Sequence, residues 1–333
     1  MLAGLADVDR LVLLGDLIEL RQGPLRRVLS VALPVLAELG AAVGPEKEIV
    51  IVPGNHDHRL LKEWRRRRPP KSQPLGLETA VDFQPAEPLG AVAEALGQAR
   101  VRVSYPGLWL RPDVYAMHGH YLDRHITVPL LERLGAGLMD RLTSSDDYEA
   151  VLAPMYDLIG VVADRGVSTG LGLQTRVWRG LERGRERRGG HESARLIPGL
   201  VRTLNVVGLG PLSPDLSGAE LRRAGLRAFA EVLNRLGVSA DYVIFGHTHR
   251  AGLLPGDETA EWVTDTGTRM VNSGCWVHSR TFTGPRPHLS PYRAGFAVEV
   301  EDEEPPRVIN LLDPLRERTC EQPASAALRP DPA

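Results

Sequence analysis

Aspartate, asparagine and histidine side chains follow four short apolar runs of the sequence, each time beside a glycine. The four segments are Gly15-Asp16, Gly54-Asn55-His56-Asp57, His118-Gly119-His120 and Gly246-His247-Thr248-His249. The runs before them are short and mostly rich in β-branched residues, which is typical of buried strands. Because ligands bind at the carboxyl ends of strands in open α/β sheets, we expect the four segments to meet in one crevice.

The residue types in these segments suit a site that holds two divalent metal ions. A carboxylate can bridge two cations, an imidazole nitrogen binds either one, and an amide oxygen completes a coordination shell. Two metal ions stabilise the attacking and leaving oxygens of a phosphoryl transfer and lower the pKa of a bound water. Neighbouring glycines permit tight turns and a close approach of the substrate. The pattern therefore predicts a metal-dependent phosphoester chemistry.

In order, strand context and spacing, the four segments resemble the second to fifth motifs of the calcineurin-like metallophosphoesterase family. The resemblance implies a set of five metal ligands: Asp16, Asn55, His118, His247 and His249. Asp16 would bridge both ions, and His249 would bind the first ion. The other three residues would bind the second ion. The ions would be Mn, Fe or Zn.

The resemblance also implies a mechanism. His56 would face the substrate and protonate the leaving oxygen, and Asp57 would orient the His56 ring. A metal-bound hydroxide would attack phosphorus in line, with the ions and His56 stabilising the developing charges. The substrate would be a small-molecule phosphomonoester, phosphodiester or pyrophosphate. His120 is more typical of a residue behind the site, or of one that contacts the substrate, than of a ligand.

The sequence departs from the family at its first motif, an Asp-x-His on the first strand. Residues 1–14, which precede Gly15, contain no histidine. We expect the family's first strand to lie before Met1, so that residues 2–10 correspond to the end of the first helix and its turn. With only Asp16 and His249 left, the first metal site would be weak or empty. The alternative is a non-catalytic scaffold with the same fold and an incomplete metal site.

The resemblance implies an α/β (α+β) fold, a four-layer αββα sandwich with a helical insertion. We expect residues 1–126 and 216–312 to form the core, residues 127–215 to form the insertion, and residues 313–333 to be a disordered tail. Further strands are expected at 269–272, 296–300 and 307–311. Helices are expected from Pro24 to Leu39, ending at Gly40, and from Ser217, which forms a capping box with Glu220.

Composition narrows the partners and the compartment. A net charge of −2 gives no reason to expect binding to nucleic acid or to a membrane surface. Two cysteines exclude a disulfide framework and favour the cytoplasm. No apolar run reaches the length of a membrane span, and the first residues do not form a signal peptide. The sequence leaves the oligomeric state open.

The insertion is expected to cover the strand ends and to select the substrate. It carries five arginines that could bind a second anionic group of a substrate, or could form a solvated helix face: Arg165, Arg176, Arg179, Arg183 and Arg185. The run Arg65–Arg68 before Pro69 is expected to form a charged loop.

Overall fold

A computed structural model describes residues 8–125 apart from 22, 70–73 and 98, residues 147–164, residues 218–278 and residues 287–313, together with Leu5 and Thr283. Most of the expected tail, residues 314–333, lies outside the described residues, as do residues 126–146 and 165–217 of the expected insertion with its five arginines.

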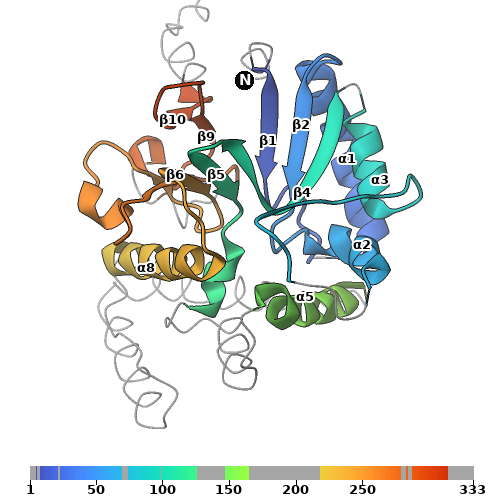
Figure 1. Ribbon diagram of the computed structural model, residues 1–333. Helices are drawn as coiled ribbons and strands as arrows, with labels where there is room; N and C mark the ends of the chain where they lie inside the picture. Colours follow the sequence, from blue (N-terminus) through green and yellow to red (C-terminus); the bar gives the residue numbers. More distant parts are fainter. Residues whose placement is uncertain are drawn as a thin grey trace, which may run out of the picture.

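The described strands form one eight-stranded sheet and one two-stranded sheet (Figure 1). In spatial order the path of the large sheet is β1 (Arg10–Leu14), β2 (Glu48–Val52), β4 (Arg100–Arg111), β5 (Val114–Met117), β6 (Tyr242–Phe245), β8 (Arg269–Ser273) and β7 (Ala251–Gly252). The short β3 (Glu78–Ala80) pairs with β4, and β9 (Phe296–Glu299) pairs with β10 (Arg307–Asn310). Four pairs of the large sheet are parallel, namely β1–β2, β2–β4, β5–β6 and β6–β8.

The two expected central sheets are halves of one curled sheet, joined by the 12-residue strand β4. Residues 100–103 of β4 pair in parallel with β2, whereas residues 107–111 pair antiparallel with β5. A register irregularity between Trp109 and Arg111 lies in the second part of β4. The mixed α/β sandwich is confirmed, and its two inner layers are continuous through β4.

Three apolar cores separate the layers. The first packs β1, β2 and β4 against α1 (Leu25–Val43) and α3 (Pro88–Ala95), with Ile49 and Leu96 fully buried. The second packs β5 and β6 against α8 (Gly218–Leu236), where the rings of Phe229 and Phe245 stack 4.1 Å apart. The third, which includes Val52, contains residues of both halves of the sheet, with β9 and β10 against it. Helices thus flank the curled sheet (Figure 1).

Two boundaries differ from those that the sequence predicts. Helix α1 runs through Gly40 and ends at Val43, with Gly44 as its C-cap. A Cβ at Gly40 would lie 2.6 Å from the carbonyl oxygen of Leu96, so a glycine there lets the helix pack closely. That glycine serves helix packing and does not end the helix. Arg65 belongs to α2 (Lys62–Arg67), so most of the expected charged loop is helical.

The described part of the insertion is one helix, α5 (Tyr148–Asp164), which packs against the 3-10 turn η2 (His58–Leu61) after β2. Further 3-10 turns are η3 (His120–Arg124), η4 (Thr259–Trp262) and η5 (Pro287–Leu289). Among the described helices, none has both the length and the apolar character that crossing a bilayer requires.

Candidate functional site

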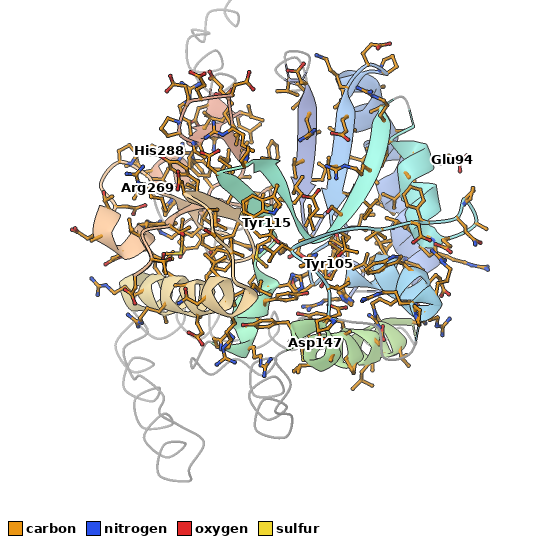
Figure 2. All side chains as sticks on the ribbon, in the orientation of Figure 1. Glu94, Tyr105, Tyr115, Asp147, Arg269 and His288 are labelled. Carbon is orange, nitrogen blue, oxygen red and sulfur yellow. The ribbon has the colours of Figure 1, made fainter. Side chains whose placement is uncertain are left out.

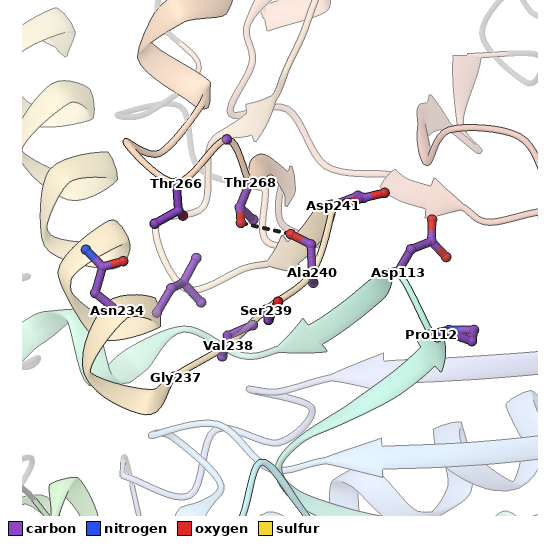
Figure 3. Close-up of a pocket in the computed structure, with 12 residues that line it drawn as sticks. Pro112, Asp113, Asn234, Gly237, Val238, Ser239, Ala240, Asp241, Thr266 and Thr268 are labelled. Atoms are coloured by element: carbon purple, nitrogen blue, oxygen red, sulfur yellow. Dashed lines mark hydrogen bonds between the residues drawn. The ribbon is translucent and has the colours of Figure 1, made fainter.

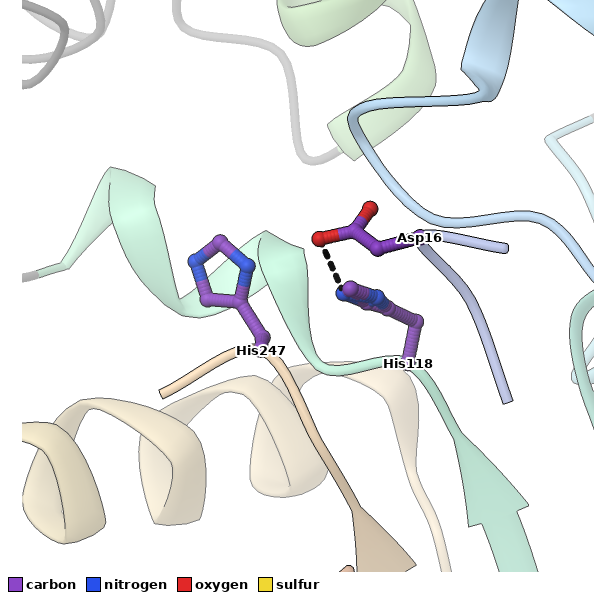
Figure 4. A group of neighbouring side chains, drawn as sticks. All are labelled: Asp16, His118 and His247. Atoms are coloured by element: carbon purple, nitrogen blue, oxygen red, sulfur yellow. Dashed lines mark ion pairs between the residues drawn. The ribbon is translucent and has the colours of Figure 1, made fainter. Parts of the chain in front are cut away.

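Three of the expected ligands meet at the carboxyl ends of the parallel strands. Asp16 follows β1, His118 follows β5 and His247 follows β6. One ligand atom from each of the three lies within 4.8 Å of those of the other two, and Nε2 of His118 is 3.3 Å from Oδ2 of Asp16 (Figure 4). Within the described part of the chain, this is the one group of three or more His, Cys, Asp or Glu side chains that could hold a metal ion. The convergence that the strand ends predict is present for these three.

Two glycines make room for the His118 ring. A Cβ at Gly15 would lie 2.3 Å from Nδ1 of His118, and one at Gly54 would lie 2.5 Å from the same atom and 2.4 Å from Oδ1 of Asp16. Any larger residue at either position would displace the imidazole or the carboxylate. The glycines of the first two motifs therefore serve the close packing of the site itself.

Backbone strain is concentrated at the site. Among the described residues, the non-glycine residues with positive φ are Asp16 (52°), His247 (63°) and His249 (62°). Left-handed conformations are uncommon for residues with a Cβ and persist where the surrounding structure enforces them. This strain marks the same strand ends that the motifs mark.

Asn272 at the end of β8 fixes the loop that carries His247. Its amide nitrogen donates to the carbonyl oxygen of Gly246 and to Oγ1 of Thr248, at 3.0 Å each, and its Oδ1 accepts from the backbone of Gly274 at 2.9 Å. The side chain is fully buried. Asn272 is thus part of the support for the histidine loop, a role that its sequence context alone does not reveal.

Asp16 and His118 form a pair of one ionised and one neutral group. Burial lowers the pKa of His118 to about 4, so its ring is neutral at physiological pH. Burial opposes the charged form of Asp16, but the surrounding histidines and the backbone N–H of His56, which donates to Oδ1 at 2.9 Å, lower its pKa. The site therefore presents one carboxylate and one uncharged imidazole to the same space.

Asn55 lies between this carboxylate and a buried arginine. Its amide nitrogen donates to Oδ1 of Asp16 at 3.2 Å, and its oxygen accepts from Nη2 of Arg21 at 3.0 Å. The Arg21 guanidinium also lies 3.5 Å from Nε2 of His56 and over the ring of Tyr156 in α5. Arg21 thus links Asn55, the expected proton donor and the described helix of the insertion.

The ring of His56 is held by Glu19, which the sequence analysis did not single out. Nδ1 of His56 lies 2.5 Å from Oε2 of Glu19, and Nε2 lies 3.8 Å from Oδ2 of Asp16. Burial acts to lower the pKa of His56, but the hydrogen bond to Glu19 and the charge of Asp16 outweigh burial and raise it. The position of Glu19, three residues after Asp16 in the same strand-end loop, is the signal that could have identified it.

Asp57 was expected to orient His56, but its carboxylate makes other contacts. Oδ2 accepts from the backbone N–H of Leu17 at 2.7 Å, and Oδ1 accepts from the backbone of Gly54 at 2.6 Å. The side chain is fully buried, and burial together with the charge of Asp16 raises its pKa to about 7. Asp57 therefore joins the loops after β1 and β2, while Glu19 contacts the His56 ring.

His249 lies outside the group formed by Asp16, His118 and His247. Burial and the charge of His247 lower its pKa, while the charge of Asp16 acts in the opposite direction. It is therefore close enough to interact electrostatically with the site. Its expected role as a ligand of the first metal ion stays a prediction.

Two further buried groups lie behind the histidines. Nε2 of His247 lies 2.9 Å from Oδ1 of Asp123 in η3, another residue that the sequence analysis missed. His120 is fully buried with its ring 5.4 Å from that of His118, and its Nε2 lies 3.1 Å from the hydroxyl of Tyr105 in β4. This position agrees with its expected place behind the site.

A hollow in the described part of the chain lies away from these side chains. It has a volume of about 590 Å³ and is lined by the chain around Asp113, Asp241 and Thr268, where β5, β6 and β8 begin (Figure 3). The expected catalytic groups and ligands follow the carboxyl ends of β1, β2, β5 and β6. The hollow therefore has no part in the chemistry of the strand-end motifs.

Comparison with known proteins agrees with this geometry. A sequence profile of the calcineurin-like phosphoesterases matches residues 2–251. No curated protein and no solved structure matches the chain significantly. The matched region covers most of the chain and contains every strand-end motif described above. The chain therefore belongs to the calcineurin-like phosphoesterase family.

Proposed function

We propose that the protein is a metal-dependent hydrolase of phosphoester or pyrophosphate bonds. The observation that carries this proposal is the convergence of Asp16, His118 and His247 at strand ends beside His56. A carboxylate, the neutral imidazole of His118 and a histidine with a raised pKa provide groups for metal binding and for proton donation at one place.

The residues fit a divalent metal ion. Both ring nitrogens of His118 are buried and make no hydrogen bond, which is costly unless another partner takes the lone pair. Asp16, His118 and His247 would hold one ion, and Asn55 would join them with its amide oxygen turned from Arg21 toward the ion. Asp16 with His249 would contribute to a second. Nitrogen and oxygen donors of this kind suit Zn, Mn or Fe. Such ions lower the pKa of water and stabilise charge that develops on a phosphoryl group.

The chain's own residues supply the remaining functions. His56, held by Glu19, donates a proton to the leaving oxygen, because its raised pKa favours the protonated ring. Arg21 lies beside Nε2 of His56, where its positive charge favours binding of a phosphoryl group. Tyr156 brings α5 to the same place, so the insertion is positioned to influence which substrate enters.

The test is hydrolysis by the purified full chain with added Mn²⁺ or Zn²⁺. We expect release of nitrophenolate from p-nitrophenyl phosphate or bis-p-nitrophenyl phosphate, and loss of that release on addition of a chelator. Asp16→Asn should lose both turnover and bound metal, because the central carboxylate is removed. Asp113→Asn is the matched control, since Asp113 pairs with Arg111 at the other end of the strands.

The outcomes separate an enzyme from a scaffold. Bound metal without hydrolysis of any phosphoester or pyrophosphate offered would favour the non-catalytic scaffold. Hydrolysis that survives Asp16→Asn would place the reaction elsewhere in the molecule.

A further inference from the structure

We propose that Asp123 is a positioning residue for His247: it holds a proton on Nε2 and thereby turns the lone pair of Nδ1 toward Asp16 and His118. This inference rests on the proposed metal site and deepens it. The contact itself is short, with Oδ1 of Asp123 2.9 Å from Nε2 of His247. Both side chains are largely buried, at 13% and 11% exposure, so water competes little for either group.

The His247 ring separates two carboxylates. In Figure 4 one ring nitrogen faces Asp16, while the other points away from it. Because Nε2 contacts Asp123, the nitrogen that faces Asp16 is Nδ1. In a neutral imidazole only one nitrogen carries a proton. When Nε2 keeps that proton and donates a hydrogen bond to Asp123, Nδ1 is left as an electron-pair donor. A metal ligand needs that state.

The backbone alone does not fix the ring. Gly246 donates to the carbonyl oxygen of His118 at 3.0 Å, and Asn272 holds Gly246 and Thr248, so the Cα of His247 is well located. Rotation about χ2 of histidine is nevertheless broad, and a half-turn would exchange Nδ1 for a carbon atom. A carboxylate behind the ring selects one of the two orientations. Outer partners of this kind also raise the basicity of a ligating imidazole.

Asp123 is itself held in place by the turn η3. Gly119, whose φ of 98° suits glycine, caps the start of the turn, which is closed by hydrogen bonds from the backbone N–H of Leu122 to Gly119 and from that of His125 to Leu122. Leu122 is fully buried in the core beneath α8. The turn thus connects His118 at its start with Asp123 near its end. One short segment therefore supplies a candidate ligand and the group that orients another.

The experiment compares Asp123→Ala, Asp123→Asn and the control Asp113→Asn in the full chain. Affinity for Mn²⁺ and Zn²⁺ is measured by competition with a chromogenic chelator. The tautomer of His247 is read from the ¹⁵N shifts of the metal-free, histidine-labelled protein, and a His247→Gln variant assigns the signals. Both readouts are independent of turnover.

We expect wild-type His247 to carry its proton on Nε2. Asp123→Ala should mix the tautomers and weaken metal binding about 10–100-fold. Asp123→Asn can still accept the hydrogen bond through its amide oxygen, so it should keep the tautomer and lose only part of the affinity. If Asp123→Ala fails to fold, the metal affinity of Asp123→Asn tests the inference. A partial loss of affinity would support it, and an affinity equal to that of the wild type would overturn it.

Three results would contradict the role of Asp123. These are an unchanged metal affinity in a folded Asp123→Ala variant, a wild-type His247 protonated on Nδ1, and a wild-type chain that binds neither ion. A wild-type chain that binds metal through His247 but hydrolyses nothing would support the positioning role while the proposed enzyme function fails.

Discussion

At the scale of single residues, His56 differs from the histidines around it. Burial lowers the pKa of His118 and of His120, whereas Glu19 and Asp16 raise the pKa of His56. The site therefore has neutral imidazoles next to one that gains a proton more readily. Separated pKa values of this kind are how neighbouring groups take different roles in acid–base chemistry.

Replacement of His56 by alanine tests its role as proton donor. We expect the variant to bind metal like the wild type, because His56 is proposed as an acid and not as a ligand. Its kcat should fall by about 10²–10⁴ on a substrate with an alcohol leaving group, which needs protonation. On a nitrophenyl ester the loss should be much smaller, since nitrophenolate leaves without a proton. Steady-state kinetics on the two substrates measure the difference.

Equal losses on the two leaving groups would contradict proton donation and indicate that His56 positions the phosphoryl group. Glu19→Gln is the companion variant, because it keeps the size of the side chain that contacts Nδ1 and removes its charge. It should show the same dependence on the leaving group, with a smaller loss.

Sequence predicted the residues that stand in strand-end motifs, and it missed those that act through them. Asp16, His118 and His247 each follow an apolar run, so their convergence follows from the geometry of parallel strands. Glu19 has only its place three residues after Asp16 as a signal, and Asp123 lies in the turn η3 with no comparable pattern. Their roles depend on the path of the loop in three dimensions, which spacing along the chain does not specify.

At the scale of elements, α5 is joined to the core by a buried polar cluster around Glu149. Oε1 of Glu149 lies 2.7 Å from Nε2 of His58, and Oε2 accepts from the hydroxyl of Tyr105 at 2.8 Å. Figure 2 shows Tyr105 of β4 just above the start of α5, which follows the labelled Asp147. Arg65 of α2 adds an ion pair with Asp157 in the same helix. Charged and polar groups therefore hold α5 on the core together with its apolar side chains, such as Leu152.

The stability of this docking should depend on pH through Glu149. Burial acts to raise the pKa of Glu149, but the charge of His58 and the hydrogen bonds from His58 and Tyr105 lower it. A carboxyl whose pKa is lower in the folded state stabilises that state above its unfolded pKa of about 4.3, and this contribution is lost as the pH falls through the folded value. We expect Glu149→Gln to cost about 1–3 kcal/mol at pH 7 and progressively less below about pH 4.

Urea unfolding between pH 7 and pH 3 measures how the difference in the free energy of unfolding between the wild type and Glu149→Gln shrinks as the pH falls. The matched control is Glu63→Gln, because Glu63 is an exposed residue that pairs with Arg66 one helical turn away. Its effect should be small at every pH. A difference between Glu149→Gln and wild type that stays constant down to pH 3 would show that the pKa of Glu149 is the same in the folded and unfolded states, and would contradict the lowered pKa.

The elements themselves were predictable to differing degrees. For each described strand with a compact apolar run, the predicted ends lie within about one residue of the observed ends, as in β2 and β6. The strand β4 was missed because it carries Arg100, Arg102, Ser104 and Pro106 among its apolar residues and changes partner midway. A strand that serves both halves of a curled sheet follows neither simple pattern. The glycine at 40 misled the prediction for α1, because glycine permits close packing as well as helix ends.

At the scale of the whole molecule, the candidate site lies between the two halves of the curled sheet. Asp16 and Asn55 follow β1 and β2 in one half, whereas His118 and His247 follow β5 and β6 in the other. Strand β4 and the third apolar core connect these halves elsewhere. A cation held by residues of both halves would add a further connection at the strand ends.

Metal binding should therefore stabilise the folded chain as a whole. A ligand that binds only the folded state adds about 2.7 kcal/mol to the free energy of unfolding when its concentration is 100 times the dissociation constant. We expect Mn²⁺ or Zn²⁺ to raise the wild-type value by this amount in urea titrations. Asp16→Asn removes the carboxylate common to both proposed ion positions, so it should abolish the increase.

The control Asp113→Asn alters an ion pair with Arg111 far from the site and should leave the metal-dependent increase unchanged. Hydrogen exchange locates the effect, because a cation that joins the halves should slow exchange after β1 and after β6 together. Slowing after only one of these strands would mean that the ion binds a single half. An equal stabilisation of Asp16→Asn and wild type would mean that the cation acts at another place, and the proposed centre would then lose its main support.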